Sequence, residues 1–195
     1  MASLSKTVGS CFAIEYFSKK NIPLDTSVNS LLEKTSSAFR IRAESHENNE
    51  WENQVTLEHL MSHSALNMHY VNGVPANLVM PPISAFLNGN KEYNYLPIRV
   101  INKPGTTFKY SGAGFMVLEH LIEELEKKSI KNLTRVFLDE LGMKEFSFEQ
   151  MKLPDVDYAY GYDDYGQEVM GTRKMFPAFA AGFLNNFQFS IKKIS

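Results

Sequence analysis

Ser3-Leu4-Ser5-Lys6-Thr7 is the stretch that carries the most information about this chain. It has the form S-x-x-K, with a serine and a lysine three positions apart. On a helix, residues at this spacing share one face, so the Lys6 amine can approach the Ser3 hydroxyl. A serine hydroxyl is a weak nucleophile until a neighbouring base takes its proton, and a lysine can serve as that base when its environment favours the neutral amine. The spacing therefore suits nucleophilic catalysis by Ser3.

The same stretch also has a purely structural interpretation. A serine just before an apolar helix is a common N-cap, and both Ser3 and Ser5 are placed to act as one. Helical spacing of apolar residues predicts a helix over residues 5–19. Its apolar stripe consists of Val8, Cys11, Phe12, Ala13, Tyr16 and Phe17. Cys11 lies on this stripe and is predicted to be a core residue rather than a thiol nucleophile.

Composition excludes several classes of function. The chain has 195 residues, of which 44% are hydrophobic and 22% are charged, and its net charge is −2. These values describe an ordinary globular domain, and without a basic stripe neither nucleic acid nor an anionic membrane is an expected partner. We find no apolar run long enough to span a bilayer and no signal peptide, so the chain as written is predicted to be cytoplasmic. The single cysteine excludes an internal disulfide.

Helices alternate with irregular segments along the rest of the chain. Residues 35–54 are predicted to be a loop with a short strand at residues 39–41. Further elements are predicted as short helices within 24–32, after Thr56 and over 81–87, longer helices over 113–128 and 131–141, a hairpin over 158–169 and a buried segment over 177–183. In the helix over 113–128, Glu119 and three other glutamates are predicted to lie outside the apolar face.

Four more segments occur in a meaningful order after the S-x-x-K tetrad. They read VTLEHLMSHS over 55–64, PGTTFKYS over 104–111, FLDELGM over 137–143 and AAGFL over 180–184. Together they resemble the ordered motifs of the serine β-lactamase-related family, which includes class C β-lactamases, D-Ala-D-Ala carboxypeptidases and related esterases. The resemblance covers the chain from residue 3 to about residue 185.

The resemblance implies a fold and a set of site residues. It implies an α+β, β-lactamase/transpeptidase-like domain over 1–187, truncated at both ends, with an irregular tail over 188–195. This would be mainly the helical subdomain, with most of the antiparallel sheet missing. By position, Ser3 matches the acyl-accepting nucleophile, Lys6 the amine that shares its proton and Tyr110 the tyrosine of the Y-x-N motif. The family needs no metal and no cofactor, and its intact members are often periplasmic or secreted.

Two departures from the family pattern bear on activity. The third position of Y-x-N is Gly112, which cannot hydrogen-bond a substrate amide, so the chain is expected to favour an ester or an unusual peptide. The third motif, K-T-G or H-x-G, does not occur, and its strand supplies one of two oxyanion-hole donors. Losing one such donor costs on the order of 10²–10³ in rate. Any hydrolysis is therefore predicted to be slow.

The sequence leaves two functions open. The first is a serine hydrolase that forms an acyl-enzyme with a β-lactam, a D-amino-acid peptide or an ester. The second is a non-catalytic remnant or binding module of the same family. An apolar face of the first helix, uncovered without the sheet, is predicted to allow self-association. His59 and His63 lie four apart as a metal pair would, but no third ligand accompanies them. The family resemblance implies a structural role for His63, at a helix end.

Overall fold

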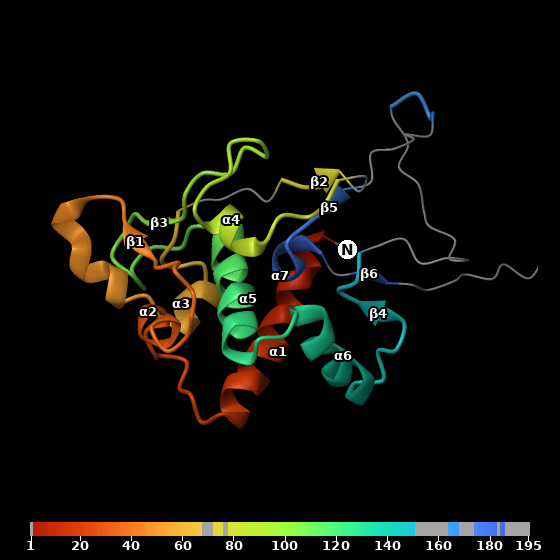
Figure 1. Cartoon of the computed structure of the whole chain (residues 1–195), viewed down its shortest axis with the longest axis horizontal. Coiled ribbons are helices and arrows are strands. Elements are labelled where there is room, and N and C mark those ends of the chain that lie inside the picture. The colour runs from red at the N-terminus through yellow and green to blue at the C-terminus, as the bar shows by residue number, and fades with distance from the viewer. Residues whose placement is uncertain are drawn as a thin grey trace, which may run out of the picture.

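The computed structural model describes residues 2–67, 72–75, 78–150, 164–167, 174–182 and 184–185. Its central element is α5 (Gly112–Glu126), around which most of the α-helices lie (Figure 1). Residues 112–122 of α5 are all buried, so this helix has no solvent face over its first three turns. The Ser111 hydroxyl caps its N-terminus by accepting the Ala113 N–H, and Lys127 ends it in a left-handed conformation.

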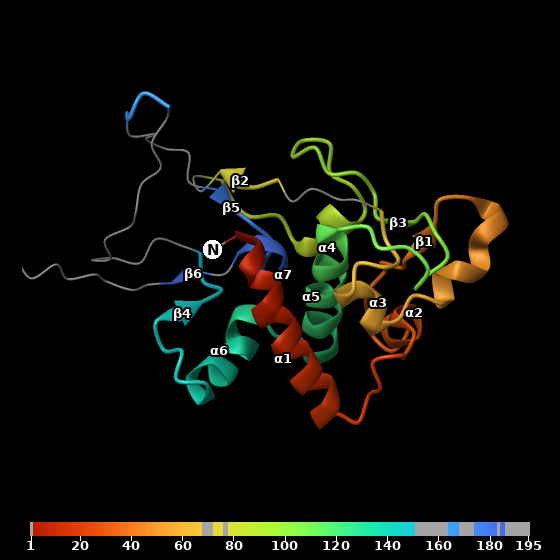
Figure 2. The ribbon, with the colours of Figure 1, turned by 180° about the vertical axis from the view of Figure 1, so that it is seen from behind.

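Two groups of helices flank α5. On one side lie α1 (Ser5–Lys19), α6 (Ile130–Glu140) and α7 (Ala178–Ala181), with α1 crossing in front of the others in Figure 2. On the other side lie α2 (Val28–Leu32) and α3 (Leu57–Met61). The remaining helices are α4 (Ile83–Leu87), η1 (Ala2–Leu4) and η2 (His46–Asn53), the last two being 3₁₀ helices.

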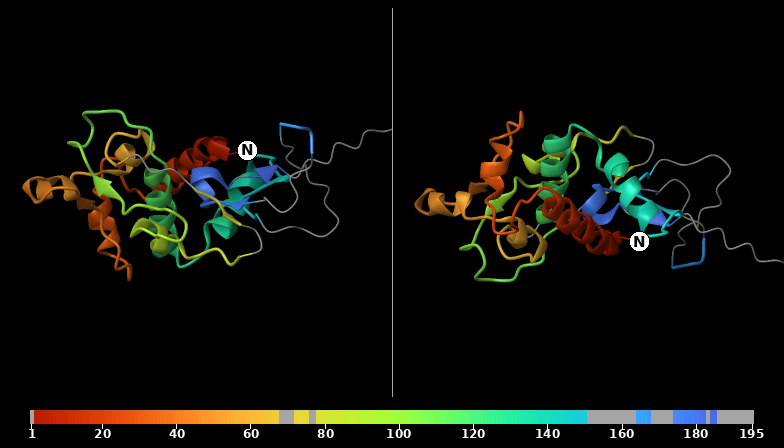
Figure 3. Two further views of the ribbon diagram at one scale, coloured as in Figure 1. Left: turned by 90° about the horizontal axis from the view of Figure 1, so that it is seen from above. Right: turned by 90° about the horizontal axis from the view of Figure 1, so that it is seen from below.

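The described strands are short and form three separate pairs. β1 (Arg42–Ala43) is parallel to β3 (Arg99–Val100). β2 (Val74–Pro75) pairs antiparallel with β5 (Lys174–Met175), and β4 (Phe146–Ser147) with β6 (Leu184–Asn185). The η2 helix and the β4–β6 pair lie near opposite ends of the described structure (Figure 3). The prediction of an α+β fold dominated by helices is thus confirmed.

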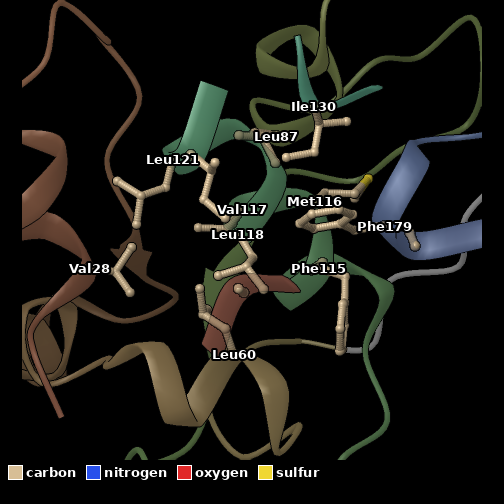
Figure 4. Close-up of a cluster of buried hydrophobic side chains, with 14 of the residues drawn as sticks. Val28, Leu60, Leu87, Phe115, Met116, Val117, Leu118, Leu121, Ile130 and Phe179 are labelled. Atoms are coloured by element: carbon tan, nitrogen blue, oxygen red, sulfur yellow. The ribbon is translucent and has the colours of Figure 1, made fainter. Parts of the chain in front are cut away.

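The hydrophobic core is built on the faces of α5. Phe115, Met116 and Leu118 point from it toward different neighbouring elements, with Leu60 of α3 and Phe179 of α7 among the packed side chains (Figure 4). At Gly114, a Cβ atom would lie only 2.4 Å from the Leu60 carbonyl oxygen. Glycine at this position therefore allows the backbones of α3 and α5 to approach closely.

Three local predictions are wrong. Cys11 is exposed rather than in the core, because the buried face of α1 contains Gly9, Phe12 and Ala13 instead. Glu119 is buried rather than outside, because α7 covers that face of α5. The strand expected at 39–41 lies at Arg42–Ala43, where the chain pairs with β3, and the loop after it contains η2.

Most of the other predicted elements are confirmed. The helices expected over 5–19, 81–87, 113–128 and 131–141 are present with small shifts at their ends. Gly142 has a φ of 73°, as expected for the residue that ends α6. The predicted hairpin over 158–169 lies outside the described residues, except for a turn at 164–167. The tail over 188–195 also lies outside them.

Candidate active site

Ser3 lies on η1, immediately before α1. The N-cap residue of α1 is Leu4, and no side-chain hydrogen bond caps this helix. The Ser3 hydroxyl instead lies within reach of Lys6 and Tyr110, and the residue is exposed. The alternative prediction, that Ser3 or Ser5 is the N-cap residue of this helix, is therefore wrong.

Lys6 lies in the first turn of α1 and is buried, with only 8% of its surface exposed. Its Nζ atom is 3.4 Å from Ser3 Oγ and donates a hydrogen bond of 2.6 Å to the Ala180 carbonyl oxygen. It also lies 5.1 Å from the centroid of the Tyr110 ring and 5.6 Å from that of Phe115. A buried ammonium group needs such partners, and these hold it beside the serine.

Tyr110 completes a compact group of three side chains. It precedes α5, and its hydroxyl donates a hydrogen bond of 2.8 Å to Ser3 Oγ. Burial raises the pKa of the Tyr110 phenol, but interactions with Lys6 and Ser3 outweigh burial and bring this pKa below its ordinary value. At this distance, proton exchange between the phenol and Ser3 Oγ is geometrically possible.

The His63 ring packs against the Tyr110 ring. It follows α3 with a φ of 57°, and its ring centroid is 4.6 Å from that of Tyr110. His63 Nδ1 accepts the N–H of Ser111 at 3.1 Å, and the His63 carbonyl accepts the N–H of Lys109 at 2.8 Å. Burial and the charge of Lys6 lower the pKa of His63, which favours the neutral ring. The sequence predicted a structural role for His63, but not this contact with Tyr110.

The histidine pair is not arranged as a metal site. His59 Nδ1 accepts the N–H of Thr56 at 3.2 Å in a reciprocal capping box at the start of α3, while His63 Nδ1 is engaged by Ser111. Among the described residues, no three potential ligands cluster as a metal ion would require. Within the same part of the chain, no helix is both long and apolar enough to cross a membrane.

Sequence reasoning missed the contribution of α7 to this site. The segment over 177–183 was predicted only to be buried, yet its Ala180 carbonyl receives the Lys6 ammonium. Every residue type has a backbone carbonyl oxygen, so residue identity could not predict this contact. Only the resemblance of AAGFL to a family motif drew attention to the segment. Gly112, at the position of the motif asparagine, is the first residue of α5 and is buried.

Comparisons with known proteins identify the family and the fold of the chain. A family model described as Beta-lactamase matches residues 1–185. A comparison with curated proteins gives no match. A penicillin-binding protein from Bacillus halodurans is similar in structure, with a TM-score of 0.62 and 19% identity over 95% of this chain and 54% of that one.

Two further solved structures share the fold. D-alanine carboxypeptidase AmpC from Burkholderia cenocepacia has a TM-score of 0.60 and 19% identity, over 94% of this chain and 44% of that one. The octameric penicillin-binding protein homologue from Pyrococcus abyssi has a TM-score of 0.57 and 22% identity, over 95% of this chain and 41% of that one. The chain thus spans about half the length of these proteins and has a partial β-lactamase/transpeptidase-like fold, as predicted. With the family match extending over nearly its whole length, the chain belongs to the Beta-lactamase family.

Proposed function

We propose that this chain carries the acylation machinery of a serine hydrolase, with Ser3 as the nucleophile. The observation that supports the proposal best is the position of Ser3 Oγ, 2.8 Å from the Tyr110 hydroxyl and 3.4 Å from Lys6 Nζ. Two proton-exchanging groups at a serine hydroxyl are the arrangement that activates such a nucleophile.

The reaction would proceed by two acyl transfers. Ser3 Oγ attacks a carbonyl carbon while its proton passes to Tyr110, which has first lost its own proton and is a phenolate stabilised by the Lys6 ammonium group. The tetrahedral intermediate collapses to an ester of Ser3, and the leaving amine or alcohol takes the proton back from the Tyr110 hydroxyl. Water then attacks the ester and releases the acid, which restores the Ser3 hydroxyl. These reaction steps need no metal and no organic cofactor.

The proposed substrate is a small amide or ester: a β-lactam, a D-amino-acid peptide or a simple ester. Related structures include a D-alanine carboxypeptidase and a penicillin-binding protein, which supports acyl chemistry on such compounds. Gly112 offers no side chain with which to hydrogen-bond a substrate amide. We therefore expect esters to react faster than amides of similar size.

The first prediction concerns covalent labelling of Ser3. A fluorophosphonate probe is expected to add once to the wild-type chain, because the probe reports activated serine hydroxyls. The Ser3→Ala variant is expected to show no adduct, and Ser18→Ala, which changes an exposed serine on the same helix, is expected to label normally. Intact-protein mass spectrometry measures the adduct, and circular dichroism shows that each protein is folded.

The opposite result would favour the second function. A folded wild-type chain with no adduct, or equal labelling of Ser3→Ala, would contradict the proposal. In that case a binding module or non-catalytic remnant of the family would describe the chain better. Slow turnover of a chromogenic ester after successful labelling would fit the proposed hydrolase.

The second prediction concerns Tyr110. The labelling rate of the wild type is expected to rise with pH as the phenol loses its proton, with a midpoint below the ordinary tyrosine value of 10.0. Tyr110→Phe keeps the ring against His63 but removes the hydroxyl, so labelling should slow by about 10²-fold. A labelling time course between about pH 6 and about pH 10 measures both effects, because its upper end is the ordinary pKa of a tyrosine and the expected midpoint lies below it. An unchanged rate in Tyr110→Phe would exclude the phenol from proton transfer.

Self-association also stays a prediction. Leu4 and Ile14 of the first helical segment are 59% and 47% exposed, and Cys11 between them is exposed as well. Spacings of seven and three residues place these side chains along one face. The structural relative from Pyrococcus abyssi is described as octameric, which supports looking for assembly here too.

A further inference from the structure

Glu119 is a buried carboxyl group that the proposed mechanism does not use. It lies in the middle of α5 and is only 6% exposed. Its Oε2 atom accepts the backbone N–H of Phe179, in α7, at 2.9 Å. Burying such a group is costly, so its position calls for an explanation beyond packing.

The contact at Phe179 lies one residue from the contact that holds Lys6. Ala180, the next residue of α7, accepts the Lys6 ammonium through its carbonyl oxygen at 2.6 Å. α7 has only four residues and too few internal hydrogen bonds to hold its own place. Its orientation therefore depends on the elements that grip it.

The elements α1, η1 and α5 all contact α7. α1 packs through Gly9, where an added Cβ would lie 2.9 Å from Phe179 Cγ, and it donates the Lys6 hydrogen bond to the Ala180 carbonyl oxygen. Gln150 holds Phe176, two residues before α7, by accepting its N–H and donating to its carbonyl oxygen. α5 contributes a hydrogen bond to α7 itself, because the Glu119 carboxyl accepts the Phe179 N–H. A hydrogen bond fixes the rotation of a short helix in a way that side-chain packing alone does not.

We propose that Glu119 is a positioning residue that orients α7, so that the Ala180 carbonyl holds the Lys6 ammonium beside Ser3. The link runs from α5 through α7 to α1. This inference rests on the proposed function for its catalytic meaning, but its structural content can be tested separately.

The charge state of Glu119 tells which substitution preserves the contact. Burial and the nearby Glu123 carboxyl raise the pKa of Glu119 to about 8, so at neutral pH the group is largely protonated. Glutamine has the shape of a protonated glutamate and retains an oxygen that can accept the Phe179 N–H. Leucine has a similar size and no acceptor.

The test compares Glu119→Gln and Glu119→Leu with a matched control, Glu123→Gln. Glu123 lies one turn further along α5, is half-buried and caps a different helix by accepting the Ile130 N–H at 2.8 Å. Fluorophosphonate labelling of Ser3 is expected to slow by about 10- to 100-fold in Glu119→Leu. In Glu119→Gln and Glu123→Gln it is expected to stay within about threefold of the wild type.

A second readout does not depend on reactivity. In protein labelled with ¹³C-lysine, the Lys6 Cε–Hε signal, assigned with Lys6→Arg, should stand apart from those of exposed lysines. In Glu119→Leu it should move into the group of exposed lysines, whereas in Glu119→Gln and Glu123→Gln it should stay in place. If Glu119→Leu does not fold, Glu119→Asp, which withdraws the carboxyl by one methylene, takes its place with the same expectation.

The two readouts separate the two proposals. If wild-type Ser3 does not label but the Lys6 signal responds as expected, the proposed function fails and the positioning role stands. If the Lys6 signal is unchanged in Glu119→Leu and in Glu119→Asp, or if Glu123→Gln moves it equally, Glu119 does not position Lys6.

Discussion

Replacing Gly114 with alanine is expected to lower the free energy of unfolding by about 3 kcal/mol or more. The new Cβ would lie 2.4 Å from the Leu60 carbonyl oxygen and 3.2 Å from Leu60 Cα. Both are backbone atoms, so no rotation of a side chain can relieve the overlap. α3 would have to move away from α5, although Leu57 and Leu60 anchor it in the core. Since domains are stable by only about 5–15 kcal/mol, a loss of this size is severe.

Gly142→Ala is the matched comparison for this prediction. Gly142 has a φ of 73° and nothing within 4 Å of an added Cβ, so alanine there meets only the cost of a left-handed backbone. That cost is about 1 kcal/mol. Chemical denaturation of the wild type and both variants measures the difference. Equal losses at the two positions would show that the contact between α3 and α5 is not as tight as described.

The stability of the chain is expected to depend on pH through Glu119. In the unfolded chain this carboxyl loses its proton near its ordinary pKa of 4.5, whereas in the folded protein burial raises the pKa to about 8. Between these values the folded state binds a proton that the unfolded state does not. Stability therefore falls as pH rises through this window, by roughly 1.4 kcal/mol per pH unit from this group.

Glu119→Gln is expected to remove this dependence. The stability of the variant relative to the wild type should increase steadily between pH 4.5 and about pH 8, which are the pKa values of the carboxyl in the unfolded and folded chain. Above this window the difference should stay constant. The total gain is on the order of several kcal/mol. Urea denaturation of both proteins at four pH values across the window measures it. A difference that does not change with pH would mean that Glu119 titrates alike in the folded and unfolded chains.

The sequence predicted elements whose signals are local. The helices α5 and α6 were predicted from the spacing of their apolar residues, and the end of α6 was predicted from Gly142. The approach of Lys6 to Ser3 follows from their spacing of three on a helix. Tyr110 was predicted only through the family resemblance, because nothing in its local sequence brings it to Ser3, 107 positions away.

What the sequence could not predict depends on which element covers which face. Periodicity assigned Glu119 to the outside of α5, because a helix buried on all faces has no polar side to identify. Cys11 was assigned to the core because it lies among the apolar residues of this helix, but the close approach of α7 turns Gly9 to the buried face and leaves Cys11 exposed. The support of Lys6 by Ala180 depends on a backbone oxygen, and residue type says nothing about backbone partners.

The contacts at Ser3 also have a consequence for how the chain folds. The Lys6–Ala180 hydrogen bond joins residues 174 positions apart, and the Ser3–Tyr110 bond joins residues 107 positions apart. Contacts of such high sequence separation form only after large loops have closed, and they make folding slow. In an early intermediate with α1 and α5 already helical, Ser3 would still lack its contact with Tyr110, and Lys6 its contact with Ala180. The reactivity of Ser3, followed during refolding, would therefore report when these long-range contacts form rather than when the helices form.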